Sequence, residues 1–83
     1  MAGRRSSVLG RRQLRYVVVF EKSATGYGAY LPDLPGCVAT AKTLAGTRKL
    51  IREAVEMHLG GMREDGEPIP EPSTLTDYIT VSA

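Results

Sequence analysis

The chain has 83 residues, of which 42% are hydrophobic and 24% are charged, and its formal net charge is +2. This length suits one small domain near the lower limit of what folds alone, so self-association is expected. The composition excludes a disordered polar chain, no apolar run reaches the roughly 20 residues of a membrane span, and a single cysteine excludes an internal disulfide.

The chain begins with a basic stretch. Residues 1–15 contain five arginines and no acid, whereas the remainder holds six basic and nine acidic side chains, a balance of −3. Residues 1–13 lack apolar periodicity, so we predict a mobile N-terminal arm there and a folded domain over residues 14–83. No apolar segment follows the paired arginines, so we expect a cytoplasmic rather than an exported protein.

The arm has two interpretations. In the first, its arginines bind nucleic acid by neutralising phosphates. In the second, the arm is disordered and only keeps the protein soluble. No aromatic residue stands between the arginines, so stacking on bases is not expected. The candidate nucleic-acid contacts are Arg4, Arg5, Arg11 and Arg12.

Three strands are predicted in the first half of the domain. Residues 14–22 (LRYVVVFEK) place Tyr16, Val18 and Phe20 on one face and valines on the other. Apolar residues on both faces indicate a central strand. Residues 27–31 follow a short turn and complete an antiparallel hairpin, and residues 37–42 are the third strand.

The stretch LPDLPGC connects the second and third predicted strands. Pro35 and Gly36 suit the central positions of a type II turn, with Gly36 at positive φ. Pro32 belongs at a strand end because it has no N–H for a ladder, and Asp33 can accept hydrogen bonds from neighbouring amides. We therefore predict a rigid connector with Pro32, Pro35 and Gly36 as its structural turn. Such a loop also suits presentation of Asp33 and Leu34 to a partner.

One helix and one further strand are predicted in the second half. Thr43 is the expected N-cap of a helix over residues 44–62, whose apolar residues recur at i, i+3, i+4 spacing, and Gly60-Gly61 is the expected stop. Prolines then force an extended path. The alternation in residues 77–82 (DYITVS) predicts a fourth strand.

The order β-β-β-α-β predicts an α+β domain in which one helix packs on a three- to four-stranded sheet. A fourth strand parallel to the first requires a right-handed crossover through the helix and makes the first strand central.

No catalytic or metal site is predicted. His58 has no nucleophile at a triad spacing, and Cys37 is expected to be a small buried apolar residue. Glu21, Glu53 and Asp77 are too scattered for the carboxylate cluster of a Mg²⁺-dependent nuclease. We expect neither enzymatic activity nor a cofactor.

Three motifs, YGAYLPDLPGCVAT, REAVEMHL and GEPIPEPS, resemble the HicB-like antitoxins of bacterial toxin–antitoxin systems in content and order. The resemblance implies a degenerate ribonuclease H-like domain that forms dimers or higher oligomers and neutralises a small messenger-RNA-cleaving toxin called HicA. The start of the helix departs from the family pattern at Ala41-Lys42 and Gly46-Thr47. Because the chain ends after the last predicted strand, we expect the short form, without the DNA-binding domain of many family members.

Several functions remain open on the sequence. The leading hypothesis is an antitoxin whose acidic helix face masks the basic surface of a HicA-like toxin. The candidate toxin contacts are Asp33, Leu34, Glu53 and Glu56. The alternatives are a nucleic-acid-binding module that uses the arginine arm, or an orphan HicB-like interaction protein that has lost its toxin. We expect a homodimer, or else a tetramer, and no membrane association.

Overall fold

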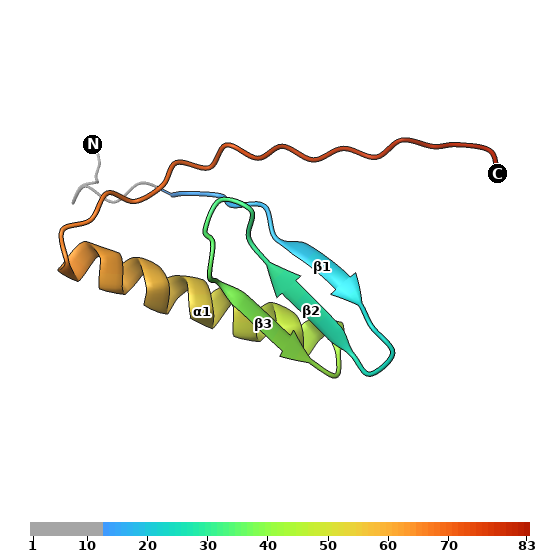
Figure 1. The fold of residues 1–83 in the computed structure, drawn as a ribbon, viewed down its shortest axis with the longest axis horizontal. Coiled ribbons are helices and arrows are strands. Elements are labelled where there is room, and N and C mark those ends of the chain that lie inside the picture. The colour runs from blue at the N-terminus through green and yellow to red at the C-terminus, as the bar shows by residue number, and fades with distance from the viewer. Residues whose placement is uncertain (1–12) are drawn as a thin grey trace, which may run out of the picture.

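The computed structural model describes residues 13–83. Its elements are β1 (Val19–Lys22), β2 (Tyr27–Tyr30), β3 (Val38–Ala41) and α1 (Leu44–Glu64). The strands form one antiparallel sheet in the order β1-β2-β3, and α1 lies across β2 and β3 on one face of it (Figure 1). This arrangement confirms the predicted α+β domain with one helix on a three-stranded sheet.

The strand register decides which residues enter the core. Side chains alternate between the two faces of a strand, so paired residues form rows across the sheet. One row joins the core beneath α1: Phe20, Ala29 and Ala39. The next row lies on the opposite face: Val19, Tyr30 and Val38. Tyr30 and Val38 are exposed, so only one face of the sheet is well covered.

The helix begins as predicted and ends later than predicted. The Thr43 side chain accepts a hydrogen bond from the Gly46 N–H at 3.0 Å, which confirms the N-cap. The expected stop at Gly60-Gly61 is wrong, because α1 continues to Glu64. The helix is held on both sides of the two glycines, since Leu59 is buried and Met62 packs against the core.

Backbone hydrogen bonds close the C-terminal end of α1. The Gly66 N–H donates to the Arg63 carbonyl at 3.2 Å, and the Glu67 N–H donates to the Met62 carbonyl at 2.9 Å. Gly66 has φ +72°. This pattern is a Schellman motif, which satisfies the last carbonyls of α1 and redirects the chain.

The predicted fourth strand does not form in the single chain. Residues 75–83 are all exposed and belong to no strand of the described fold. The first strand is consequently at an edge of the sheet and not central. The ribonuclease H-like order, which needs a fourth strand beside β1, is not present in one chain.

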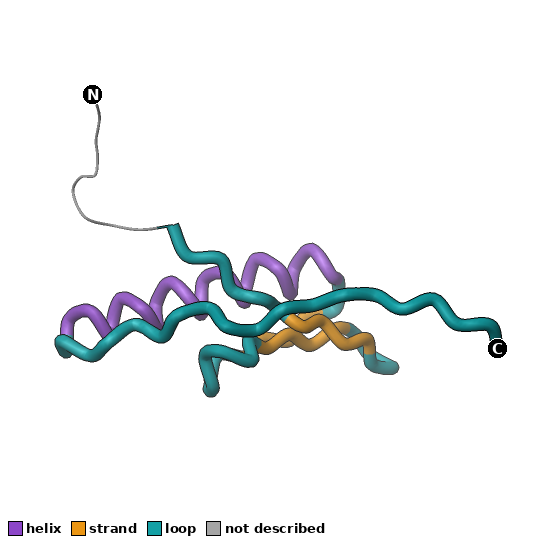
Figure 2. The backbone as a smooth tube through the Cα atoms, turned by 90° about the horizontal axis from the view of Figure 1, so that it is seen from above, coloured by secondary structure: helices purple, strands orange, loops and turns teal. Residues whose placement is uncertain are grey.

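The C-terminal residues instead run past the sheet and end away from the body in both views (Figures 1 and 2). The radius of gyration is 16.0 Å, against about 12 Å for a compact chain of this length. The extended C-terminal segment therefore gives the chain a larger radius of gyration than a compact domain of the same length has.

Candidate functional site

The connector between β2 and β3 is built from two consecutive turns. The Leu34 N–H donates to the Leu31 carbonyl at 3.2 Å, and the Cys37 N–H donates to the Leu34 carbonyl at 3.2 Å. Gly36 has φ +96°, as the central glycine of a type II turn requires. The predicted structural turn is confirmed, with Pro32, Pro35 and Gly36 exposed on its outer side.

The inner side of the connector belongs to the core. Leu31, Leu34 and Cys37 recur every three residues, and all three side chains are buried. Leu34 is only 1% exposed, so the expectation that the connector presents this side chain to a partner is wrong. The connector closes one end of the core, and burial there raises the pKa of the Cys37 thiol.

Asp33 joins the connector to the C-terminal segment. Ser73 donates its N–H to Asp33 Oδ2 at 2.9 Å and its hydroxyl to Oδ1 at 3.0 Å. Thr74 donates its N–H to Oδ2 at 3.1 Å and its hydroxyl to Oδ1 at 2.8 Å. We call these three residues the Asp33 clamp. Asp33 therefore does accept backbone N–H groups, but from residues that are distant in sequence and not from its neighbours.

The clamp stabilises the ionised form of Asp33. The Ser73 N–H contributes most, followed by the N–H and hydroxyl of Thr74, and together they lower the pKa of the Asp33 carboxyl from 3.8 to about 2. Hydrogen bonds donated to a carboxylate favour its charged form in this way. Asp33 is thus a charged anchor at neutral pH.

A second contact holds the same segment further upstream. The Tyr16 hydroxyl donates to the Pro70 carbonyl at 2.6 Å, and Ile69 packs against the core. Residues 68–74 therefore follow a fixed path along the residues that lead into β1. Alternating prolines restrict the backbone of this path further.

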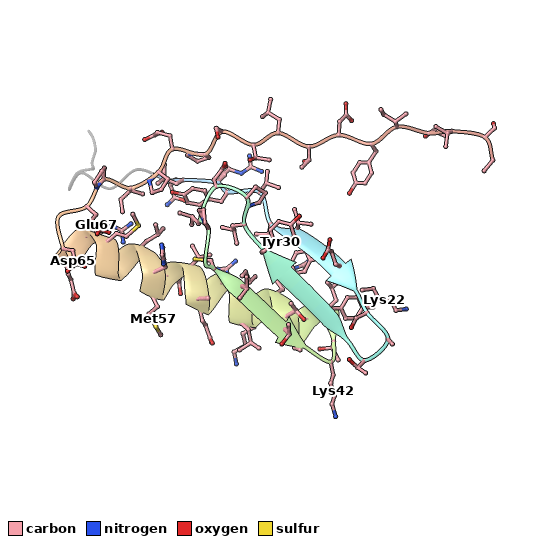
Figure 3. All side chains as sticks on the ribbon, viewed as in Figure 1. Lys22, Tyr30, Lys42, Met57, Asp65 and Glu67 are labelled. Carbon is pink, nitrogen blue, oxygen red and sulfur yellow. The ribbon has the colours of Figure 1, made fainter. Side chains whose placement is uncertain are left out.

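The exposed surface of α1 carries both signs of charge. Its first half presents Arg48, Lys49 and Arg52, and the Arg48 guanidinium lies over the Phe20 ring at 5.6 Å. Glu53 and Glu56 are exposed one helical turn apart. Further acidic residues follow toward and beyond the helix end, where Figure 3 labels Asp65 and Glu67. The exposed acidic residues therefore begin at Glu53 in the middle of α1 and continue into the turn after it, with Arg63 among them.

Apolar side chains are exposed in three places. Met57 projects from α1 on the side away from the sheet, and Tyr30 lies on the open sheet face (Figure 3). The third place is the C-terminal segment, whose large side chains Leu75, Tyr78, Ile79 and Val81 are exposed. Surfaces of this kind suit contacts with other protein chains better than small-molecule chemistry.

The described residues show no assembled catalytic constellation. Within residues 13–83, no three His, Cys, Asp or Glu side chains come together as metal ligands, and no helix is long and apolar enough to cross a membrane. His58 is exposed on α1 and does not belong to its buried stripe. A shallow hollow of about 600 Å³ lies at the hairpin end of the sheet and includes Glu21, Tyr27 and Lys42 in its lining.

The structure separates the predicted site residues into two groups. Glu53 and Glu56 are on one exposed helix surface, whereas Asp33 is in the connector and is engaged by the clamp. The candidate nucleic-acid contacts Arg4, Arg5, Arg11 and Arg12 lie outside the described residues. The prediction for the arm therefore stays a prediction.

Sequence reasoning missed Ser73 and Thr74 as partners of Asp33. The available signal was weak: a Ser-Thr pair directly after the last proline offers four donors, and Asp33 is an acceptor in a rigid turn. It also missed the core role of Leu34, for which the three-residue spacing of Leu31, Leu34 and Cys37 was the signal. The predicted burial of Cys37 is confirmed.

Comparison with known proteins identifies relatives over most of the chain. The family profile described as "HicB_like antitoxin of bacterial toxin-antitoxin system" matches residues 16–82. An uncharacterised 14.9 kDa protein of Haemophilus phage HP1 is 36% identical over 64 residues, which cover 77% of this chain and 48% of the phage protein. A UPF0150 protein of Helicobacter pylori is 40% identical over 47 residues, which cover 57% of this chain and 65% of that protein. The chain thus spans about half to two thirds of these relatives.

The fold has a relative among solved structures. A chain of the structure titled "HicA3 and HicB3 toxin-antitoxin complex" is similar with a TM-score of 0.60 and 30% sequence identity. The likeness covers 71% of this chain and 69% of that chain. This chain is therefore similar to that chain in both sequence and tertiary structure.

Proposed function

The chain belongs to the HicB-like antitoxin family, and from this premise we propose that it is an antitoxin that binds and neutralises a small HicA-like toxin. The observation that carries the proposal is its likeness, in sequence and fold, to a chain of the complex titled as HicA3 with HicB3. We place the pair in the cytoplasm, where a messenger-RNA-cleaving toxin has its substrate.

The proposed mechanism is masking of the toxin's RNA-binding surface. A protein that binds RNA presents basic side chains to the phosphates. Glu53 and Glu56 project from the same exposed side of α1, and the acidic residues beyond them extend this surface toward Glu67. Complementary charge of this kind accelerates association and fixes the orientation of the two proteins more than it sets affinity.

Basic side chains border the two glutamates on α1. Lys49 and Arg52 each lie four residues before one of them, and Arg63 is exposed in the last turn. A toxin docked with its basic groove on Glu53 and Glu56 meets these cations at the edge of the contact, which disfavours other orientations. We propose separately that Asp33 also contacts the toxin. Its carboxylate already accepts hydrogen bonds from Ser73 and Thr74, so such a contact adds to the clamp.

Calorimetric titration tests the proposal. The chain is titrated with a HicA-like protein, sought in the neighbouring reading frame and inactivated for expression, and RNA cleavage by the active form of that protein is measured in parallel. Saturable binding with a fixed stoichiometry and loss of cleavage is the expected result. Absence of binding with unimpaired cleavage contradicts it.

The nucleic-acid alternative has its own test. The five arginines among residues 1–15 favour it. It predicts salt-sensitive binding of the full chain to duplex or single-stranded nucleic acid, and loss of that binding when residues 1–13 are deleted. Retained toxin binding by the deleted chain separates the two functions.

A further inference from the structure

The open face of the sheet, opposite α1, carries two neighbouring rows of residues. The first row is Val19, Tyr30 and Val38, and the second is Glu21, Gly28 and Thr40. Tyr30 is 40% exposed at the centre of the first row, whereas Gly28 has no side chain at the centre of the second. The two residues are about 7 Å apart along β2. An exposed aromatic ring therefore stands beside an open space on the central strand.

This open space belongs to the shallow hollow of about 600 Å³ at the hairpin end of the sheet, which Gly28 lines. A methyl group added at Gly28 would meet only Thr40 Cγ2 at 3.8 Å and the Ala39 carbonyl oxygen at 3.9 Å, which are ordinary contact distances. Gly28 does not have a positive φ either. Neither packing nor backbone conformation therefore requires glycine here, and its lack of a side chain keeps the hollow open.

The rim of the hollow is basic and carries hydroxyl groups. Lys22 and Lys42 line it together with Thr25 and Thr40, and Glu21 is the single carboxylate of the lining. Figure 3 shows the two lysines at this end of the sheet, and both are exposed. Lysine and threonine side chains are common contacts of phosphate oxygens. The rim therefore suits an anionic ligand that carries phosphate groups.

We propose that the open sheet face binds single-stranded nucleic acid. A base stacks on Tyr30, and the adjoining phosphates cross the hollow over Gly28 to Lys22 and Lys42. The two lysines alone would equally suit an acidic peptide, and the exposed ring beside them is what favours a nucleic acid, because every base has a face that stacks on an aromatic side chain. A shallow hollow does not enclose a small molecule, whereas a strand crosses it and continues on both sides.

This site lies in the folded body and is separate from the arginine arm. It also does not depend on the toxin, since the open sheet face is opposite α1 and the acidic residues proposed to contact that protein. Each of the three binding functions can therefore fail without the others.

Fluorescence anisotropy of labelled oligonucleotides tests the proposal. The probe is an oligouridine of about 12 nucleotides, compared with an oligothymidine and with a duplex of the same length. The protein is the full chain with Arg4→Gln, Arg5→Gln, Arg11→Gln, Arg12→Gln, so that the arm does not contribute. A dissociation constant of about 1–100 μM is expected at low salt for a single strand, and the ratio of the two single strands shows whether RNA or DNA is preferred. No single-strand binding, or equal binding of the duplex, overturns the proposal.

Substitutions on β2 test the stacking and the hollow. Tyr30→Thr removes the ring but keeps a residue suited to a strand, and it is expected to weaken binding about tenfold or more. Tyr30→Phe is the matched control, because it keeps the ring, and it should bind as the wild type does. Gly28→Val fills the hollow at a position with room for the side chain, so it should weaken binding about tenfold without lowering the thermal midpoint. Wild-type binding by Tyr30→Thr and Gly28→Val overturns the proposal.

The dependence of binding on salt tests the lysines. Lys22→Gln, Lys42→Gln removes two phosphate contacts, so the slope of log K against log salt concentration should fall in magnitude by about 1.4. Arg52→Gln, Arg63→Gln removes the same charge from exposed positions on α1, across the sheet, and should leave the slope unchanged. Equal changes of slope in the two double variants overturn the assignment to the hollow.

Another protein chain is the competing occupant of the open sheet face. Light scattering of the wild type and of Tyr30→Thr separates the two, because loss of a stacking ring should leave the molecular mass unchanged. A change of mass with unaltered affinity for the oligonucleotides indicates a protein on this face and overturns the proposal.

Discussion

Asp33 and Thr74, which are 41 positions apart, share two hydrogen bonds: the Thr74 N–H reaches Asp33 Oδ2 at 3.1 Å and the Thr74 hydroxyl reaches Oδ1 at 2.8 Å. With the matching pair from Ser73, they attach the family-typical connector to the C-terminal segment. The connector thus has a long-range structural role that its proline-rich turn chemistry does not reveal.

Removing the charge of Asp33 is expected to release the segment. Asp33→Asn keeps the size of the side chain but replaces one carboxylate oxygen with an NH2 group. That group donates hydrogen bonds and cannot accept the two, one from Ser73 and one from Thr74, that the oxygen accepted. Amide hydrogen exchange at Ser73 and Thr74 should accelerate at least about tenfold. Asp77→Asn is the control, because Asp77 accepts only from the adjacent Tyr78 N–H in the described contacts. Equal exchange rates in both variants contradict the clamp.

The clamp should also respond to acid. The pKa of Asp33 is about 2 in the folded protein and 3.8 ordinarily. A lowered folded-state pKa contributes stability that is complete above about 4 and is lost as the pH falls toward 2. Amide shifts of Ser73 and Thr74 should therefore titrate with a midpoint near 2 by NMR. In Asp33→Asn this transition should disappear, and a midpoint near 4 in the wild type argues against the clamp.

Leu34 is expected to be a major contributor to stability. Leu34→Ala removes a side chain that is almost fully buried and leaves a cavity where the connector meets the core. The free energy of unfolding should fall by about 2–5 kcal/mol. Leu50→Ala, at a partly exposed position of α1, should cost less than about 1 kcal/mol. Urea denaturation at one fixed protein concentration measures the free energy of unfolding of both variants. Similar losses of stability in the two variants would contradict the core position of Leu34.

The continuation of α1 through its two glycines gives a further prediction. An added methyl at Gly60 meets no atom within 4 Å, so Gly60→Ala should stabilise the protein by about 0.5–1 kcal/mol. Gly66→Ala should instead destabilise it, because Gly66 has φ +72° in the terminal turn. Thermal unfolding of both variants checks the opposite signs.

Charge reversal on α1 tests the proposed docking surface. Glu53→Lys, Glu56→Lys should slow association with the HicA-like toxin by about tenfold or more at low salt, and the effect should shrink as salt is added. Glu21→Lys, Asp77→Lys changes the net charge equally at exposed positions outside α1 and the turn after it. Stopped-flow association rates compare the pairs, and equal rates remove Glu53 and Glu56 from the interface.

The sequence by itself determined the local structure. Thr43 at the N-cap, Pro35-Gly36 in the connector turn and the alternation around Ala29 each fix the backbone through contacts within a few residues. Such preferences act over short range, so the hairpin, the helix start and the α+β class were predictable. The motifs on these elements were enough to indicate the family.

Only the tertiary structure decided the rest. The partner of Asp33, the burial of Leu34 and the edge position of β1 depend on how distant segments meet, which no short-range preference encodes. The alternation of residues 77–82 was recognisable as a strand, but a strand forms only where an edge accepts its backbone hydrogen bonds. In the single chain the segment does not pair with the free edge of β1, because the connector holds Ser73 and Thr74 and the residues after them run away from the body (Figure 1).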